Sequence, residues 1–419
     1  MIDELKDLRK IPNSKKLNVV SYYPVFESQS SLENHYFRAK WYMPYVLDVL
    51  DKVVMPYLGS YEYLAQPEYM CSSDSEAEHI EIVSDEQDYL DALVKSKIIL
   101  VWQKISEDER DTLDKHCQVF DITTDNLETV EYGLYCKILW QMTTKEQKEM
   151  LLESSHSRFK KFAMDVRNKN YCGAAVFGTG PSVETANQFD FSNCYTHACN
   201  TVVQSKELLD VIDPDIISAG DVVSHFGVSA YAQKFREDLA SAMSERGFYF
   251  LTTAQFGYLF MVHYPELKDK ILLCEQRGFI INCDLEKDWN LPIMDSTFNI
   301  HMMPSAFTMS DTVFVLGCDG KNPDDSKNED FWEHSAKAQY HDLVDSGHLA
   351  HPTFDIHRQR STWDGYVSSV IQTCGLSEAL YGKKIISLAQ SYTPGLTERS
   401  IKSDALKVAY PWIVSQDKK

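Results

Sequence analysis

The feature that most constrains this chain is an apolar run that ends in a glycine turn and continues into a helix-compatible segment. It lies at residues 174–186 (AAVFGTGPSVETA), and its turn is Gly178-Thr179-Gly180-Pro181-Ser182. Glycines let a ligand approach the backbone, and Pro181 suits a first helical turn because it has no N–H. Main-chain N–H groups at such a turn bind anions, so the segment predicts a phosphate or nucleotide site. The alternative is an ordinary strand-to-helix turn, because the segment matches neither GxGxxG nor the P-loop pattern.

Strand-like and helix-like runs alternate from about residue 169 to the end. The helix-like runs include 228–246. The expected strands share apolar, β-branched or aromatic composition and lie at 172–178, 193–198, 215–220, 247–252, 270–274, 312–317 and 383–389. Alternation of this kind predicts a doubly wound parallel sheet that binds ligands at the carboxyl ends of its strands.

A second, smaller α/β region precedes it. Strand-like runs lie at 17–23, 97–102 and 118–124, and Ser106 with Glu109 suits a helix capping box. The intervening sequence predicts an aromatic helix that continues through Tyr57 and a solvated acidic loop over 71–88. We therefore expect two Rossmann-like domains with mostly parallel sheets in the arrangement of two-domain glycosyltransferases. The expected boundaries are 1–126 for an N-terminal domain on the acceptor side, 127–168 for a helical connector, and 169–419 for the nucleotide-sugar domain.

Composition excludes several classes of function. The net charge is −21, from 41 basic and 62 acidic residues, which argues against nucleic-acid binding because that requires a basic surface. No run of 18 to 20 apolar residues is present, and the first residues have no signal-peptide core. The ten cysteines lack CxxC spacing, so we expect free thiols, a cytoplasmic location and no transmembrane segment. Peripheral contact with a membrane and the oligomeric state stay open.

Polar residues follow two further expected strands. Asn200 ends CYTHACN, and Asp221 ends DPDIISAGD. An asparagine or a carboxylate at the end of a strand can bind a base or a ribose, and the carboxylate can also act as a base. Each residue could instead cap the helix that follows it.

The turn, Asn200 and DPDIISAGD together resemble the GxGPS-type family of bacterial sialyltransferase-like enzymes. This family includes motility-associated flagellin glycosyltransferases and a branch of archaeal pterin pyrophosphokinases. The segment 303–320 (MPSAFTMSDTVFVLGCDG) resembles its serine-bearing segment and the strand that ends in glycine and aspartate. The resemblance covers about 170–395. It implies a CMP-activated nonulosonic acid or Kdo as donor and a glycan or lipid-linked acceptor. It also implies nucleotide contacts from Gly178–Ser182, Asn200, Ser305 and Asp319.

Catalytic candidates follow from the same resemblance. His334 lies where the small sialyltransferases carry a catalytic histidine, so it is the first candidate for the base that takes the acceptor proton, with Asp221 second. His351, in a His-Pro pair, resembles the residue that binds the donor phosphate. If configuration is retained, Asp221 or Asp319 could act as the nucleophile instead. Arg358 and Arg360 could hold the donor carboxylate, or they could be solvated.

Two groups of residues are candidates for a metal site. The five histidines between His334 and His357 have no zinc spacing, and Asp319, Asp324 and Asp325 contain no DxD. We therefore expect no metal and no cofactor. The alternative function is a Mg²⁺-dependent pyrophosphokinase that acts on a pterin with ATP, and only there would Mg²⁺ be needed. A third hypothesis is a non-catalytic nucleotide-binding protein.

Overall fold

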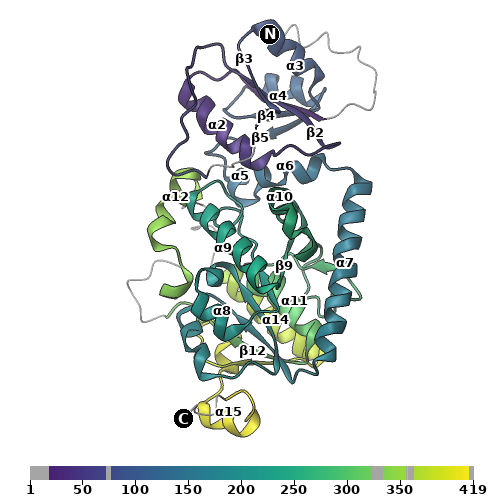
Figure 1. Ribbon diagram of the computed structural model, residues 1–419, viewed down its shortest axis with the longest axis vertical. Helices are drawn as coiled ribbons and strands as arrows, with labels where there is room; N and C mark the ends of the chain where they lie inside the picture. Colours follow the sequence, from purple (N-terminus) through teal and green to yellow (C-terminus); the bar gives the residue numbers. More distant parts are fainter. Residues whose placement is uncertain (1–17, 72–76, 323–333, 355, 357–362, 415–419) are drawn as a thin grey trace. The chain divides into compact units, whose positions relative to one another are not determined.

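The chain forms two compact α/β units. The computed structural model describes residues 18–71, 77–322, 334–354, 356 and 363–414 (Figure 1). The first unit comprises Met1–Lys148, Val222–Gln233 and Leu343–Arg358. The second unit comprises Glu149–Asp221, Lys234–Asp342 and Gln359–Lys419. In the described part of each unit the strands form one parallel sheet, so the predicted fold class is confirmed.

The first unit has a five-stranded sheet in its described residues, in the order β3-β2-β1-β4-β5. Its strands are β1 (Asn18–Tyr23), β2 (Leu50–Pro56), β3 (Ile80–Val83), β4 (Ile98–Val101) and β5 (Gln118–Asp121). Its helices are α2 (Gln29–Tyr42), α3 (Glu86–Lys95), α4 (Glu107–Asp114), α5 (Leu127–Glu131), α6 (Leu134–Met142) and α12 (Val344–Ala350). Ser106 and Glu109 form the expected capping box at the start of α4. Valine and isoleucine side chains of β1, β2 and β4 pack on α3 in one core.

Two local predictions in this unit were wrong. The aromatic helix ends at Tyr42, and the following residues form β2, whose β-branched valines pair with β1 and β3. The acidic stretch 71–88 contains β3 and the start of α3. Apolar Ile80 and Val83 are buried in β3 while Glu81 is exposed. Tertiary pairing therefore overrides the polar composition of this segment.

The second unit has an eight-stranded sheet among its described residues, in the order β11-β10-β9-β8-β7-β6-β12-β13. Its strands are β6 (Gly173–Phe177), β7 (Cys194–Cys199), β8 (Ile216–Ser218), β9 (Tyr249–Thr253), β10 (Ile271–Gln276), β11 (Asn290–Leu291), β12 (Thr312–Leu316) and β13 (Lys384–Ser387). The seven strands predicted in this region are all present. Only the two-residue β11 was not predicted, because the dipeptide Asn-Leu is too short to show the composition or the alternation of a strand. The central strands β6 and β7 are buried along their whole length, as expected for strands that are covered on both faces.

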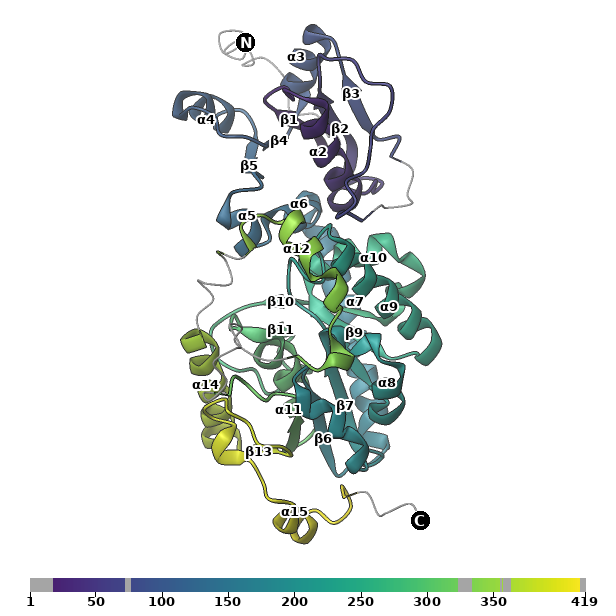
Figure 2. The ribbon, with the colours of Figure 1, turned by 90° about the vertical axis from the view of Figure 1, so that its left-hand side faces the viewer.

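Helices cover both faces of this sheet (Figure 2). On one face, α7 (Lys145–Asn168), α11 (Met303–Met309) and α14 (Trp363–Tyr381) share a core with alternate residues of β6 and β12. On the other lie α8 (Lys206–Ile212), α9 (Ala230–Arg246) and α10 (Ala254–His263). The unit also contains a C-terminal helix, α15 (Ser403–Ala409). Its short helical turns include η2 (Pro181–Gln188), η3 (Asn200–Gln204), η4 (Pro265–Lys270), η5 (Phe298–Met302), η6 (Ala336–Ala338) and η8 (Thr397–Arg399). The unit is thus a doubly wound fold.

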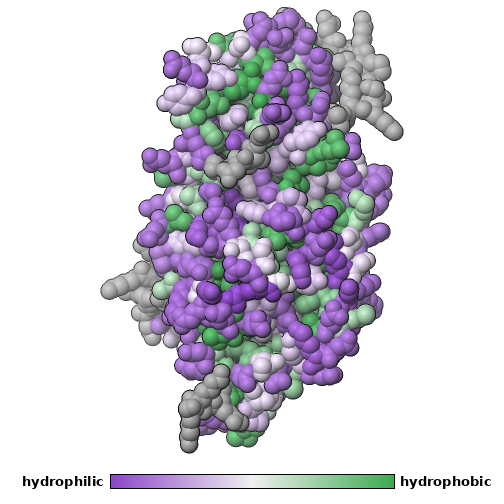
Figure 3. All heavy atoms as spheres, in the orientation of Figure 1, coloured by the Kyte–Doolittle hydropathy of each residue, from purple (hydrophilic) through white to green (hydrophobic). Residues whose placement is uncertain are grey.

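The visible face of the molecule is mostly hydrophilic, with small apolar patches between the polar side chains (Figure 3). Of the helices that the described residues form, none combines the length and the apolar character needed to span a membrane. The residues expected to form a helical connector, 127–168, are helical and form α5, α6 and α7.

Candidate functional site

The sheet of the second unit changes direction at β6. From β6 the chain builds β7 to β11 on one side, and β12 then starts the other side next to β6. Two neighbouring strands whose connections leave in opposite directions create a crevice at their carboxyl ends, where α/β proteins bind ligands. A cavity of about 310 Å³ lies here. That volume is within the range of small-molecule sites.

Most of the residues predicted for the site line this cavity. They come from the ends of β6, β7, β8 and β12 and from the segment after residue 333: Gly178, Thr179, Gly180, Asn200, Asp221, Asp319 and His334. Because carboxyl ends of parallel strands meet at one edge, residues up to 156 positions apart in the chain lie around one space.

Two glycines let β6 and β12 approach at this edge. A Cβ on Gly178 would lie 2.2 Å from the carbonyl oxygen of Gly317, and one on Gly317 would lie 2.4 Å from that of Gly178. Gly317 also has φ +73°, a conformation that favours glycine. The N–H of Gly178 donates to Leu316 at 2.8 Å. Both glycines are therefore required by the contact between the two strand ends.

Several amides in and next to the turn already have acceptors in this structure. Gly180 N–H donates to the Gly317 carbonyl at 2.8 Å, and Val183 N–H donates to the Gly180 carbonyl at 3.0 Å. Ser182 N–H donates to Oδ2 of Asp319 at 3.1 Å. Asp319 thus takes the position at the start of η2 where an anionic ligand was expected. An incoming anion must compete with this carboxylate.

His334 is docked on the same turn. Its Nδ1 lies 3.0 Å from Oγ1 of Thr179, and the N–H of Ser335 donates to the Thr179 carbonyl at 2.7 Å. Ser335 in turn donates its hydroxyl to Glu184 at 2.6 Å. Burial, with a smaller contribution from His341, lowers the pKa of His334 to about 4. The imidazole is therefore neutral at pH 7.

Two residues of the cavity wall have left-handed backbone conformations. Asn200 has φ 51° at the end of β7, and Ser296 has φ 71°. Oδ1 of Asn200 accepts a hydrogen bond from the hydroxyl of Thr297 at 3.2 Å, which ties the two segments together. Non-glycine residues in this region cost free energy and gather at functional sites.

The wall is acidic. Asp221, Asp295 and Asp319 line the cavity, and the lining contains no lysine or arginine within the part of the chain that the structure describes. Within the same residues, no group of three or more histidine, cysteine, aspartate or glutamate side chains is placed to hold a metal ion.

The other predicted residues lie elsewhere. Pro181 and Ser182 belong to the turn but do not line the cavity; the Ser182 hydroxyl accepts from Gly317 N–H at 2.9 Å. Ser305 is fully buried in α11, where it bonds the hydroxyl of Tyr195 at 2.6 Å. His351 belongs to the first unit and is buried there. Arg358 and Arg360 lie outside the described residues.

One wall of the cavity had no sequence prediction. It is formed by residues 295–302, which include the π-helical turn η5, and by Tyr366 of α14. Phe298, Ile300 and Met302 make this wall partly apolar. A π-helical turn is rare and frequent at functional sites, but it has no sequence signature. No local pattern could therefore have identified this segment.

Comparisons with known proteins add no identification. Neither the models of known protein families nor the curated proteins nor the solved structures contain a match to this chain.

Proposed function

We propose that the second unit binds a nucleotide-linked donor in this cavity and that the protein is a glycosyltransferase. The donor would be a CMP-activated nonulosonic acid or Kdo-type sugar, and the acceptor a hydroxyl of a glycan or lipid-linked glycan. The observation that carries this proposal is the cavity at the switch point of the sheet, which unites Thr179, Asn200, Asp221, Asp319 and His334. The resemblance of GTGPS and DPDIISAGD to the sialyltransferase-like family supplies the donor class.

The side chains divide into two groups by chemistry. Asn200 and Asp221 stand at neighbouring strand ends, where amide and carboxylate groups can bind the base and the ribose hydroxyls. Thr179 and the Ser182 amide lie at the turn, where the phosphate of CMP would be held once Asp319 releases that amide. The partly apolar wall of Phe298 and Tyr366 suits the face of a sugar or base.

His334 would be the base of this reaction. The acceptor hydroxyl loses its proton to the imidazole while its oxygen bonds the anomeric carbon, and the bond from that carbon to the CMP oxygen breaks. A pKa near 4 makes the imidazole a weak base in the empty cavity. The negative charge of a bound donor raises the pKa of a neighbouring imidazole, which favours proton transfer once the donor is present.

The acidic wall supports one second candidate. Three aspartates and the absence of basic side chains from the described lining favour a phosphate that arrives with a divalent cation. Mg²⁺ binds one or two carboxylates together with substrate phosphates. This is the chemistry of a pyrophosphokinase that uses ATP and Mg²⁺ on a pterin. A non-catalytic nucleotide-binding protein would use the same cavity without turnover.

The cysteines support a cytoplasmic location for the proposed activity. All ten are free thiols, and most are buried. Such a pattern suits a reducing compartment such as the cytoplasm.

Ligand binding separates these candidates. We expect calorimetry to detect binding of CMP to the whole protein in the presence of EDTA, and CMP-sialic acid or CMP-Kdo to bind more tightly than UDP-glucose. ATP bound only with Mg²⁺, and no binding of CMP, would instead support the pyrophosphokinase. A protein that binds CMP-sugars but never releases CMP from them would be a sensor.

The role of His334 is tested by turnover. His334→Ala should slow release of CMP from the donor by about 10²-fold or more and leave the affinity for CMP within a factor of about two. The exposed His116 offers a matched control, since His116→Ala should change neither value. A near-normal rate in His334→Ala would remove this residue from the mechanism.

A further inference from the structure

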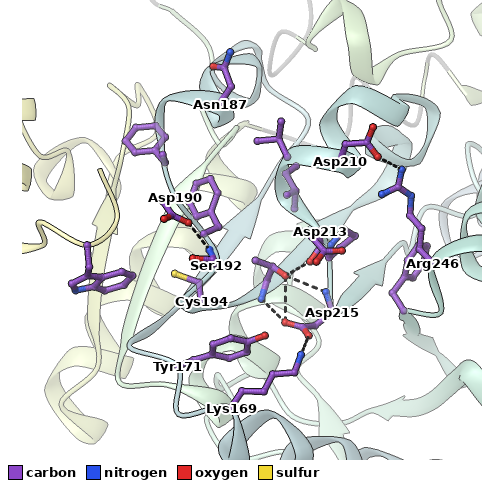
Figure 4. Close-up of a pocket in the computed structure, with 18 of the residues that line it drawn as sticks. Lys169, Tyr171, Asn187, Asp190, Ser192, Cys194, Asp210, Asp213, Asp215 and Arg246 are labelled. Atoms are coloured by element: carbon purple, nitrogen blue, oxygen red, sulfur yellow. Dashed lines mark hydrogen bonds and ion pairs between the residues drawn. The ribbon is translucent and has the colours of Figure 1, made fainter. Parts of the chain in front are cut away.

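A second and larger cleft lies at the opposite edge of the same sheet. Its volume is about 1310 Å³, and its walls come from the segments that precede β6, β7, β8 and β9, with Trp412 near the end of the described chain (Figure 4). These are the amino ends of the strands, so the cleft is separate from the proposed donor site. Its volume exceeds the range of about 300–1,000 Å³ that is typical of small-molecule sites.

The cleft is acidic. Its described lining contains four aspartates, Asp190, Asp210, Asp213 and Asp215, against two basic residues, Lys169 and Arg246. Lys169 pairs with Asp215 at 3.0 Å, and Arg246 pairs with Asp210 at 2.5 Å. Figure 4 shows Asp190 on one side of the cleft and the other three aspartates across from it. Each basic residue of the cleft is thus already paired with an aspartate, and the lining has more negative than positive side chains.

The helices add to this negative potential. α7, α8 and α9 all end at this edge of the sheet, at Asn168, Ile212 and Arg246. The carboxyl end of a helix carries partial negative charge and attracts cations. Because helices and strands run in opposite directions in a doubly wound fold, this edge gathers helix carboxyl ends. The aspartates and the helix ends therefore attract the same kind of ligand.

Aromatic rings give the cleft a surface suited to cationic side chains. Nζ of Lys169 lies 5.2 Å from the ring centre of Tyr171, and Nζ of Lys270 lies 4.4 Å from that of Tyr249. Both rings line the cleft, as does the partly exposed Trp412. Lysine and arginine side chains bind such ring faces, most strongly that of tryptophan. The protein's own lysines already make the contact that an incoming basic chain would make.

We propose that this cleft docks a lysine- or arginine-rich polypeptide segment of a partner protein. Its volume accommodates a chain segment, and its charge excludes nucleic acid and a second copy of this acidic chain. The molecule's net charge of −21 would also steer a basic partner toward it. The proposal does not depend on what the donor cavity binds.

The test uses a lysine-glycine decapeptide, with a glutamate-glycine decapeptide and spermidine as comparison probes. Fluorescence anisotropy with the whole protein should detect the lysine peptide at about 50 mM NaCl and show weaker binding at about 300 mM. The glutamate peptide should not bind. If spermidine at equal charge displaces the labelled lysine peptide as well as unlabelled peptide does, the ligand need not be a polypeptide and the proposal is overturned. Failure of the lysine peptide to bind would also overturn it.

Asp213 offers a conservative variant. It has φ 45° after α8, a conformation that asparagine adopts readily, so Asp213→Asn removes the charge and keeps the backbone. We expect this variant to weaken peptide binding about three- to fivefold. Glu153 is an exposed residue of α7 that does not line the cleft, so Glu153→Gln should leave the affinity for the peptide unchanged. An equal loss of peptide affinity in the two variants would show that binding depends only on the overall charge of the protein. That result would contradict the proposal.

A second readout reports the place of binding. Cys172 is the exposed cysteine of the ten, and it comes directly after Tyr171, which lines the cleft. Bound lysine peptide should slow the reaction of Cys172 with a maleimide, whereas the glutamate peptide should not. An unchanged reaction rate under saturating peptide would place the binding elsewhere and overturn the proposal.

Discussion

A single carboxylate governs access to the glycine turn. Oδ2 of Asp319 accepts the N–H of Ser182, and a Cβ added to Gly180 would lie 2.2 Å from the same oxygen. Asp319 therefore fills the space and the hydrogen bond that a phosphate oxygen would use. It acts as an internal anion at the start of η2, where negative charge is favourable. Binding of an anionic ligand must break this contact.

We expect Asp319→Asn to raise the affinity for CMP by about tenfold, because the variant removes a competing negative charge from the turn. Calorimetry on the variant and the unmodified protein measures the change. Asp295→Asn is the matched control, since Asp295 lines the same cavity without bonding the turn. If Asp319→Asn binds CMP more weakly than Asp295→Asn, Asp319 holds the ligand and does not exclude it.

At the scale of elements, the contact between the ends of β6 and β12 depends on glycine. Main-chain atoms of the two strand ends pass so closely that no side chain fits between Gly178 and Gly317. The two strands belong to opposite halves of the sheet. Their close approach shapes the floor of the crevice in which the cavity lies.

Gly178→Ala should therefore lower the free energy of unfolding by about 3 kcal/mol, because its Cβ would meet the backbone of Gly317. Urea denaturation measures this change. Gly375→Ala, on the exposed face of α14 with open space around it, should instead stabilise the protein by about 0.5–1 kcal/mol. Equal stability of Gly178→Ala and the unmodified protein would show that the strand ends can separate without cost.

At the scale of the whole molecule, both units bury neutral histidines. Burial, with a smaller contribution from Arg38, lowers the pKa of His35 and that of His351 to about 3, from an ordinary value of 6.5. His334 in the second unit behaves similarly. Nδ1 of His35 and Nε2 of His351 have no hydrogen-bond partner within the described chain. These imidazoles stay neutral in the folded state.

The unfolded chain therefore binds more protons than the folded chain below pH 6.5, and stability must fall as the pH falls from 6.5 toward 4. The loss is on the order of 2 kcal/mol for each buried histidine at pH 5. His35→Leu should flatten the dependence of the urea midpoint on pH, whereas His116→Gln, at an exposed position, should not. If the pH dependence of the urea midpoint is unaltered in His35→Leu, the buried His35 does not cause the loss of stability at low pH.

Local patterns predicted much of the second unit. Apolar runs such as AAVF and TVFVL predict strands from their local composition alone. The glycines and the proline of GTGPS predict a turn in the same way. Asn200 and Asp221 were identified because each follows such an apolar run, and Asp319 was identified through the resemblance of segment 303–320 to a strand that ends in glycine and aspartate. In the first unit the polar content of 71–88 concealed β3, since a short strand is stabilised by its neighbours more than by its own composition.

The sequence by itself determined the α/β class, the glycine turn and the polar residues at the strand ends, because these depend on interactions over a few residues. Only the tertiary structure decided which of them share a cavity. It placed His351 in the first unit, buried Ser305 in α11, brought residues 295–302 to the cavity, and set Asp319 against the Ser182 amide. Such outcomes depend on strand order and on contacts across more than a hundred residues, which no local pattern encodes.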